Sequence, residues 1–187
     1  TFYYKHKGNP FEVFRSPEEL LYLELNLSSI KDFSGIENFP NLRRLETELC
    51  SKLESEAGIS ALKDTLEFLH INNSKKYSPT NELYQLKNLK VLRLTTCGPL
   101  EDLNFLYEFP NLIEFGFVQT NVLNGDLSPL LEHPTLRRAA FLDRRHYSHK
   151  FEQIDKVLES RSSGVFKETV YKGTYSTFIY KAFLGES

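Results

Sequence analysis

The nine residues LKVLRLTTC, numbers 89–97, place apolar side chains at a spacing that decides the local structure. Leu89, Leu92 and Leu94 hold the first, fourth and sixth places, so the last two lie on one face of an extended chain. Cys97 comes three residues later and offers a small side chain that can hydrogen-bond to a turning backbone. The stretch therefore predicts a short strand with one buried face, followed by a turn.

The same pattern returns at a nearly constant interval along most of the chain. Six copies can be aligned, and their first residues lie 22 to 24 positions apart. An interval of this size, repeated this often, predicts a stack of similar units. The six copies begin at Leu20, Leu42, Leu66, Leu89, Leu112 and Leu136.

A second apolar pair, with members three residues apart, precedes most copies. A spacing of three is typical of one or two turns of α-helix or 3₁₀ helix. Each unit is then one strand plus one short helical segment, and it can bury its apolar side only against its neighbours. The pairs are Ile36 with Phe39, Ile59 with Leu62, Leu83 with Leu86 and Leu106 with Phe109, and Leu130 stands alone in the last unit.

A small side chain follows each of the first five strands at one fixed offset. These residues are Ser28, Cys50, Ser74, Cys97 and Thr120. With this position filled, the chain from Leu20 to Asp143 resembles the leucine-rich-repeat superfamily, whose consensus has Asn or Cys there. The resemblance implies an α/β horseshoe solenoid of about six repeats, with a parallel concave sheet and short convex helices or 3₁₀ turns. It leaves function open, because the superfamily includes receptors, phosphatase regulators, ubiquitin-ligase adaptors and toxin inhibitors.

The length of 187 residues suits one domain, which we divide into an N-terminal cap (1–19), repeats (20–143) and a C-terminal cap (144–187). In the first cap, Ser16-Pro17-Glu18-Glu19 predicts a capping box at the start of a brief helix. Six apolar residues before it are expected to cover the edge of the sheet. They are Phe2, Tyr3, Tyr4, Phe11, Val13 and Phe14.

The C-terminal cap is expected to contain a helix and a β-hairpin. Phe151, Ile154, Val157 and Leu158 follow helical spacing, and the helix should end between residues 160 and 164. Two segments rich in Thr and aromatic residues, 165–171 and 174–180, flank Lys172-Gly173 and predict the hairpin. The hairpin could close the end of the sheet, or its aromatic side chains could contribute to a binding surface.

Charge and cysteine content restrict the partners and the compartment. The net charge is −2, and 23 Lys and Arg are interleaved with 25 Asp and Glu, so we expect neither nucleic acid nor an anionic membrane as a partner. Cys50 and Cys97 lie two repeats apart, hence about 10 Å, which exceeds the roughly 7 Å reach of a disulfide. Free thiols suit a reducing compartment, so we expect a cytoplasmic protein that is monomeric when free.

The common catalytic motifs are absent from the sequence, and we expect no enzyme, cofactor or metal. His146 and His149, three residues apart, could share a helix face and hold a metal, but no third ligand is apparent nearby. His70 with Glu46, Arg44 and Arg93 is the one set that could assemble a catalytic pocket. His70 alone is either an ordinary surface side chain or a partner contact.

The residues between the core leucines should point to the concave side, because side chains alternate across a strand. Aromatic residues and Arg among charges of both signs are typical of protein interfaces. Gly116 and Ala140 should leave a shallow depression in this face. The alternative is an ordinary solvated face, with the partner on a loop edge or on the hairpin. The predicted partner-binding residues are Tyr22, Glu24, Arg44, Glu46, Glu48, Phe68, His70, Asn72, Arg93, Glu114 and Arg138.

Two functions remain after these exclusions, and in both the partner is another protein. In the first, the chain inhibits or neutralises its partner, such as a toxin or an enzyme, through the concave face. The chain resembles free-standing bacterial leucine-rich-repeat proteins, some of which look like immunity proteins for secreted toxins, and this favours the inhibitor. In the second, the chain is a scaffold or regulatory subunit that docks onto an enzyme and directs it.

Overall fold

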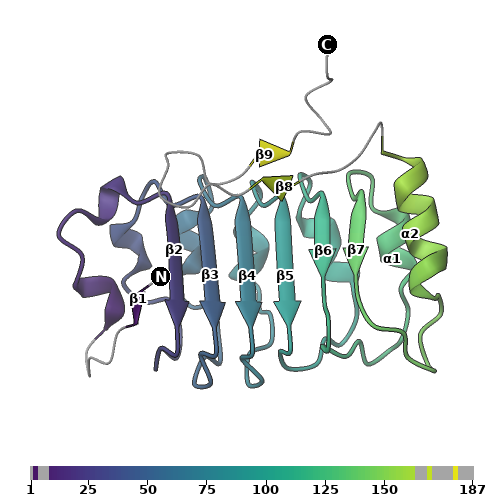
Figure 1. Ribbon diagram of the computed structural model, residues 1–187, viewed down its shortest axis with the longest axis horizontal. Helices are drawn as coiled ribbons and strands as arrows, with labels where there is room; N and C mark the ends of the chain where they lie inside the picture. The colour runs from purple at the N-terminus through teal and green to yellow at the C-terminus, as the bar shows by residue number, and fades with distance from the viewer. Residues whose placement is uncertain (1, 4–8, 163–167, 170–178, 181–187) are drawn as a thin grey trace, which may run out of the picture.

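The computed structural model describes residues 2–3, 9–162, 168–169 and 179–180 (Figure 1). Its main sheet is parallel, and its strands stand side by side in chain order from β1 to β7. They are β1 (Phe2–Tyr3), β2 (Tyr22–Asn26), β3 (Arg44–Glu48), β4 (Phe68–Asn72), β5 (Val91–Thr95), β6 (Glu114–Gly116) and β7 (Arg138–Ala140).

The segments between β2 and β7 run along the other side of the molecule, behind the sheet in Figure 1. Four are 3₁₀ helices and the fifth is a short α-helix, as the spacing of three predicted. The members of every apolar pair are fully buried, and so is Leu130. The segments are η3 (Ile36–Asn38), η4 (Ile59–Leu62), η5 (Leu83–Gln85), η6 (Asn104–Glu108) and α1 (Ser128–Glu132).

The register of the sheet stacks equivalent residues of successive repeats. Leu23, Leu45, Leu69 and Leu92 are partners on neighbouring strands, so they form one continuous column in the core. Strands β2 to β7 stand at all six predicted positions. The chain folds as a leucine-rich-repeat solenoid.

Three of the small residues that follow the strands, Cys50, Cys97 and Thr120, tie their repeat to the preceding one. Cys50 Sγ lies 3.7 Å from the carbonyl oxygen of Leu25, and Cys97 Sγ lies 3.3 Å from that of Ile71. Thr120 Oγ1 donates to the Leu94 carbonyl at 2.7 Å. Both cysteines are free thiols. The side chains at this position therefore provide hydrogen-bond partners for backbone carbonyls that the turn leaves without a partner in the sheet.

Thr120→Val is expected to lower the free energy of unfolding by about 2 kcal/mol. The substitution keeps the shape but removes the hydroxyl that serves two backbone groups, the Leu94 carbonyl and the Cys97 N–H at 3.0 Å. Urea unfolding followed by circular dichroism measures the change. Thr47→Val is the matched control, because the buried Thr47 hydroxyl has no hydrogen-bond partner within the described residues. It should leave stability unchanged or raise it, and equal losses in both variants would contradict this role of Thr120.

The N-terminal cap differs from its prediction in three respects. Strand β1 pairs in parallel with β2 and extends the sheet, which the sequence did not indicate. Val13 is 45% exposed, whereas Phe11 is buried against Phe39 as expected. The capping box is wrong: Ser16 makes no side-chain capping bond, because its backbone carbonyl already receives the Glu19 N–H in the single turn of η2. The cap's 3₁₀ helices are η1 (Pro10–Glu12) and η2 (Pro17–Glu19).

At the other end, helix α2 (Phe151–Ser160) lies where the spacing predicted it and packs on β7 and α1. Strands β8 (Glu168–Thr169) and β9 (Ile179–Tyr180) pair antiparallel, as the predicted hairpin requires. The turn expected at Lys172-Gly173 lies outside the described residues. Over the described ranges, no helix is long and apolar enough to cross a membrane.

Candidate functional site

The side chains of β2 to β7 that point away from the 3₁₀ helices form one surface, which we call the sheet face. All the predicted partner-binding residues lie on it, in three rows fixed by the register. The first row is Tyr22, Arg44, Phe68, Val91, Glu114 and Arg138, the second is Glu24, Glu46, His70, Arg93, Gly116 and Ala140, and the third is Asn26, Glu48, Asn72 and Thr95.

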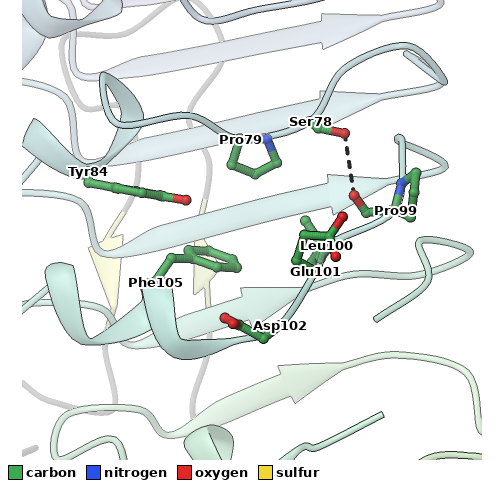
Figure 2. A pocket seen from close by; sticks show the side chains of 8 residues that line it. All are labelled: Ser78, Pro79, Tyr84, Pro99, Leu100, Glu101, Asp102 and Phe105. Carbon is green, nitrogen blue, oxygen red and sulfur yellow. Dashed lines mark hydrogen bonds between the residues drawn. The ribbon is translucent and has the colours of Figure 1, made fainter. Parts of the chain in front are cut away.

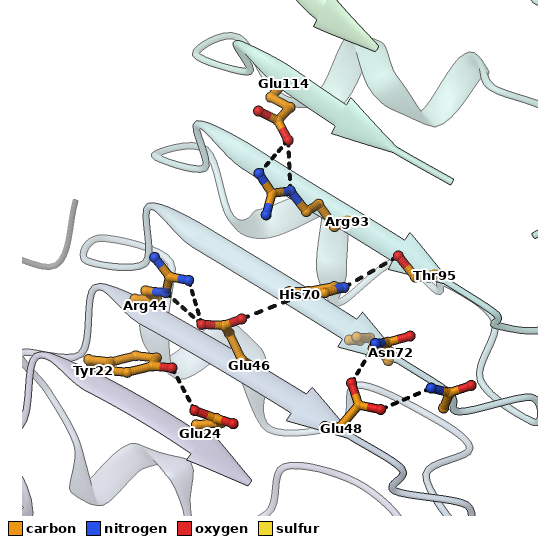
Figure 3. A network of polar contacts seen from close by, with 12 residues as sticks. Tyr22, Glu24, Arg44, Glu46, Glu48, His70, Asn72, Arg93, Thr95 and Glu114 are labelled. Carbon is orange, nitrogen blue, oxygen red and sulfur yellow. Dashed lines mark hydrogen bonds and ion pairs between the residues drawn. The ribbon is translucent and has the colours of Figure 1, made fainter. Parts of the chain in front are cut away.

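Four polar side chains in the middle of the sheet face form a continuous chain of contacts (Figure 3). Arg44 Nε donates to Glu46 Oε1 at 2.7 Å, and the other oxygen of that carboxylate lies 3.5 Å from His70 Nδ1. His70 Nε2 lies 3.3 Å from Thr95 Oγ1. Contacts that run across three strands hold these side chains in one arrangement before any partner arrives.

These neighbours change the acidity of Glu46. Burial by itself raises the pKa of this carboxyl, but the contact with His70 and the Arg44 guanidinium outweigh it and lower the pKa from 4.5 to about 2. Because the pKa is lower in the folded chain than in the unfolded one, Glu46 stabilises the fold fully above about pH 5. That contribution is lost as the pH falls toward 2.

Glu46→Gln should therefore cost about 2 kcal/mol of stability at pH 7, since it removes a charge that is only 18% exposed from its basic partners. The difference from the wild type should shrink between pH 5 and pH 2, where the wild-type carboxylate takes up its proton. Urea unfolding at a series of pH values measures this. A difference that stays constant down to pH 2 would show that Glu46 does not titrate as described.

Phe68 lies on the sheet face as predicted, but it is fully buried and cannot offer its ring to a partner. The Arg44 guanidinium carbon stands 3.9 Å from the centre of the ring, and that of Arg93 stands 5.2 Å away. Each arginine gains a cation–π contact in this position. The Phe68 ring therefore packs beneath the two guanidiniums and holds them in place. It does not offer the contact to a partner that had been expected.

Glu114 and Arg44 are likewise less accessible than expected, with 2% and 5% of their surface exposed. Arg93 Nε donates to one oxygen of Glu114 at 2.7 Å, and the other oxygen of Glu114 lies 3.6 Å from Arg138 Nη1. A carboxylate buried between two guanidiniums fixes both in place. Arg138, at 49% side-chain exposure, is more exposed than Arg93 at 26%.

The edge of the sheet face where the strands end carries a second group of contacts. Glu48 accepts hydrogen bonds from the side-chain amides of Asn72 and Asn73, the latter at 2.9 Å. Tyr22, at the start of β2, donates its hydroxyl to Glu24 in the middle of the same strand at 2.9 Å. Burial together with Glu46 raises the pKa of Tyr22.

Thr95 and Asn73 belong to these contacts but are not among the predicted site residues. Strand alternation places Thr95 on the concave side as well, beside Asn72 in the register. Asn73 lies in the turn after β4, where strand alternation no longer tells which way a side chain points.

Gly116, where a shallow depression was expected, is a buried residue of β6 beside the Arg93 side chain. A Cβ atom built on Gly116 would stand 3.4 Å from Arg93 Cγ and 3.8 Å from Ala140 Cβ, which is ordinary van der Waals contact. A larger side chain could therefore leave the backbone here and extend over the sheet face.

The two C-terminal histidines do not share a helix face, because they lie in turns that precede α2. His146 Nε2 lies 3.0 Å from the Val122 carbonyl, and His149 Nδ1 lies 2.8 Å from Ser148 Oγ. In the described ranges, no three His, Cys, Asp or Glu side chains gather closely enough to hold a metal ion.

A hollow of about 310 Å³ lies away from the predicted residues, between η5, η6 and the loops that precede them (Figure 2). Tyr84 and Phe105 stack across part of it, with ring centres 5.8 Å apart. Ser78 donates to the Pro99 carbonyl at 3.3 Å and joins the two loops of its rim. The other lining residues are Pro79, Leu100, Glu101 and Asp102.

Comparison with known proteins gives structural matches alone. No protein-family model and no curated protein sequence matches the chain. An internalin C2 from Listeria monocytogenes aligns over 68% of this chain and 66% of its own, with 22% identity and a TM-score of 0.46. An internalin (inlF) from the same species aligns over 67% and 48%, with 21% identity and a TM-score of 0.42. The chain thus spans less than two thirds of either structure, and its fold assignment rests on its own repeats.

Proposed function

We propose that this chain is a non-catalytic module that binds another protein on its sheet face and inhibits that protein by covering its working surface, as an immunity-type inhibitor does. The contact chain from Arg44 through Glu46 and His70 to Thr95 is the observation that supports this most. Side chains already held by their neighbours lose less conformational entropy when a partner docks. An arrangement of this kind favours tight binding. The proposal includes that the chain is monomeric when free and resides in the cytoplasm.

The sheet face also has the mixed charge that protein interfaces use for specificity. Carboxylates dominate β2 and β3, where Glu24, Glu46 and Glu48 accompany the single Arg44. Two arginines accompany the single Glu114 from β5 to β7. A partner with the opposite distribution would be steered into one orientation.

The fold is of a type that presents an extended surface for binding. The test begins with capture of binding proteins from an extract of the source cells on the immobilised chain, with mass spectrometry to identify them. The captured protein's activity is then titrated with the chain. An inhibitor should abolish that activity at a 1:1 ratio with nanomolar affinity. Full activity at saturation would refute inhibition.

The hollow between η5 and η6 favours one alternative, a scaffold or regulatory subunit. A scaffold needs two binding surfaces, and this hollow lies apart from the sheet face. Size-exclusion chromatography with light scattering would then detect a complex of three chains in which the captured enzyme stays active. A complex of only two chains, in which the enzyme is inactive, would support the inhibitor function.

A further inference from the structure

The first residue after each of the strands β2 to β5, and its counterpart after β6, has a left-handed backbone. The five φ angles lie between 53° and 58°, so the turn is a property of the repeat and not of one sequence. Asn adopts this conformation readily, whereas larger side chains are strained there. The five residues are Leu27, Leu49, Asn73, Thr96 and Gln119.

Leucine suits this position poorly, because its backbone is strained there and its apolar side chain is exposed to water. The chain nevertheless uses leucine in two successive repeats. Leu27 is 61% exposed and Leu49 is 45% exposed, so neither side chain repays its backbone strain by packing in the core. The later repeats carry polar residues at the same place. Residues that are unfavourable for the local backbone conformation and do not stabilise the fold are expected where a function requires them.

The two leucines are neighbours in space. The Leu27 N–H donates to the Glu48 carbonyl at 2.9 Å, which joins the turn after β2 to the end of β3. The Leu49 N–H makes the equivalent bond to Asn72 at 3.1 Å. The leucines therefore form one apolar edge at the ends of β2 and β3.

Negative charge adjoins this edge. In the register Glu24 stands directly beside Glu46, and like charges on neighbouring strands repel one another. Arg44 is bound to Glu46, and Glu48, the residue before Leu49, is held by asparagine amides that carry no charge. On the strand positions of β2 and β3 that belong to the sheet face, three carboxylates thus accompany one guanidinium.

We propose that Leu27 and Leu49, together with Glu24 and Glu48, form a docking edge for a protein segment that carries an apolar side chain flanked by Lys or Arg. The leucines would bury the apolar side chain, and the carboxylates would select the basic ones. The proposal rests on the proposed function and specifies the chemistry of the partner.

Selection of random dodecapeptides displayed on phage, with the wild-type chain as target, tests this chemistry. The enriched peptides should combine Leu, Ile or Phe with Lys or Arg, and a synthetic copy should bind the chain in a fluorescence anisotropy assay. The apolar area that each leucine loses corresponds to a tenfold or larger loss of affinity for the peptide. The double variant Leu27→Asn, Leu49→Asn should therefore weaken that peptide's binding about a hundredfold. Its melting temperature should be equal to or higher than the wild type's, because Asn tolerates the left-handed backbone.

The matched control is Thr96→Asn, Gln119→Asn, which places the same residue at the same turn position away from the leucines. It should leave peptide affinity unchanged. The variant Glu24→Gln, Glu48→Gln should weaken binding severalfold and reduce its dependence on salt concentration. Acidic consensus peptides, failure to enrich any peptide, or equal binding by wild type and the leucine variant would each overturn the proposal.

The same variants separate this proposal from the proposed function. If the captured protein partner binds the leucine variant as tightly as the wild type but is lost when the centre of the sheet face is blocked, the sheet-face function holds and the docking edge is refuted.

Discussion

Replacing Phe117 by alanine is expected to lower the free energy of unfolding by about 4 kcal/mol, a large part of the stability of a domain this size. Phe117 is 1% exposed and stacks between Phe115 at 5.3 Å and Phe141 at 4.9 Å. Tyr147, from the turn before α2, also contacts the ring of Phe117 at 6.2 Å. The substitution would therefore open a cavity where the last repeats meet the C-terminal cap.

Urea unfolding followed by circular dichroism measures this loss. Leu142→Ala is a suitable control, because Leu142 directly follows Phe141, the stacking partner of Phe117, but is 54% exposed. It should change stability by less than about 0.5 kcal/mol. A loss below 1 kcal/mol for Phe117→Ala would contradict the packing described for the C-terminal repeats.

Gly116→Arg should weaken partner binding at least about a hundredfold while the chain remains folded. A Cβ atom fits at Gly116 in ordinary van der Waals contact with Arg93 and Ala140, and a long side chain would then rise from the middle of the sheet face. Since the backbone at this position belongs to an ordinary strand, the cost to stability should stay within about 1 kcal/mol.

Ala61→Arg is the matched control for this variant. Ala61 is exposed on η4, on the opposite side of the molecule, so the same new side chain should leave binding intact. Isothermal titration calorimetry with the captured partner gives both affinities, and thermal unfolding confirms that both variants are folded. Equal affinities would move the binding site away from the sheet face.

The repeat interval was sufficient to predict the strands, because it fixes the register of every repeat against the next. Once Leu45 is placed beside Leu69, the residues between the leucines must appear on the sheet face in order. The helical segments were predictable too, since pairs such as Ile59 and Leu62 have no other way to be buried.

Accessibility on the sheet face could not be predicted in this way. Alternation tells which side of a strand a residue occupies, but not which neighbours cover it. Phe68 is buried with guanidiniums over its ring, and those come from the strands on either side, more than 20 residues away in sequence. The burial of Glu114 arises in the same manner, from contacts between residues of different repeats.

The ends of the solenoid were less predictable than its middle. Strand β1 consists of two residues whose sequence carries no repeat, so only its pairing with β2 identifies it. The exposed leucines after β2 and β3 also escaped the pattern, because they occupy a turn position that the motif leaves unspecified.

The most direct test of the central claim, that the sheet face binds the protein partner, is NMR chemical-shift mapping of the isotope-labelled chain with and without that partner. We expect the largest shifts at sheet-face residues of β2 to β7, such as Glu24, His70, Thr95 and Gly116. Shifts confined to η3 to η6 and the hollow beside Tyr84, with the sheet face unchanged, would contradict it.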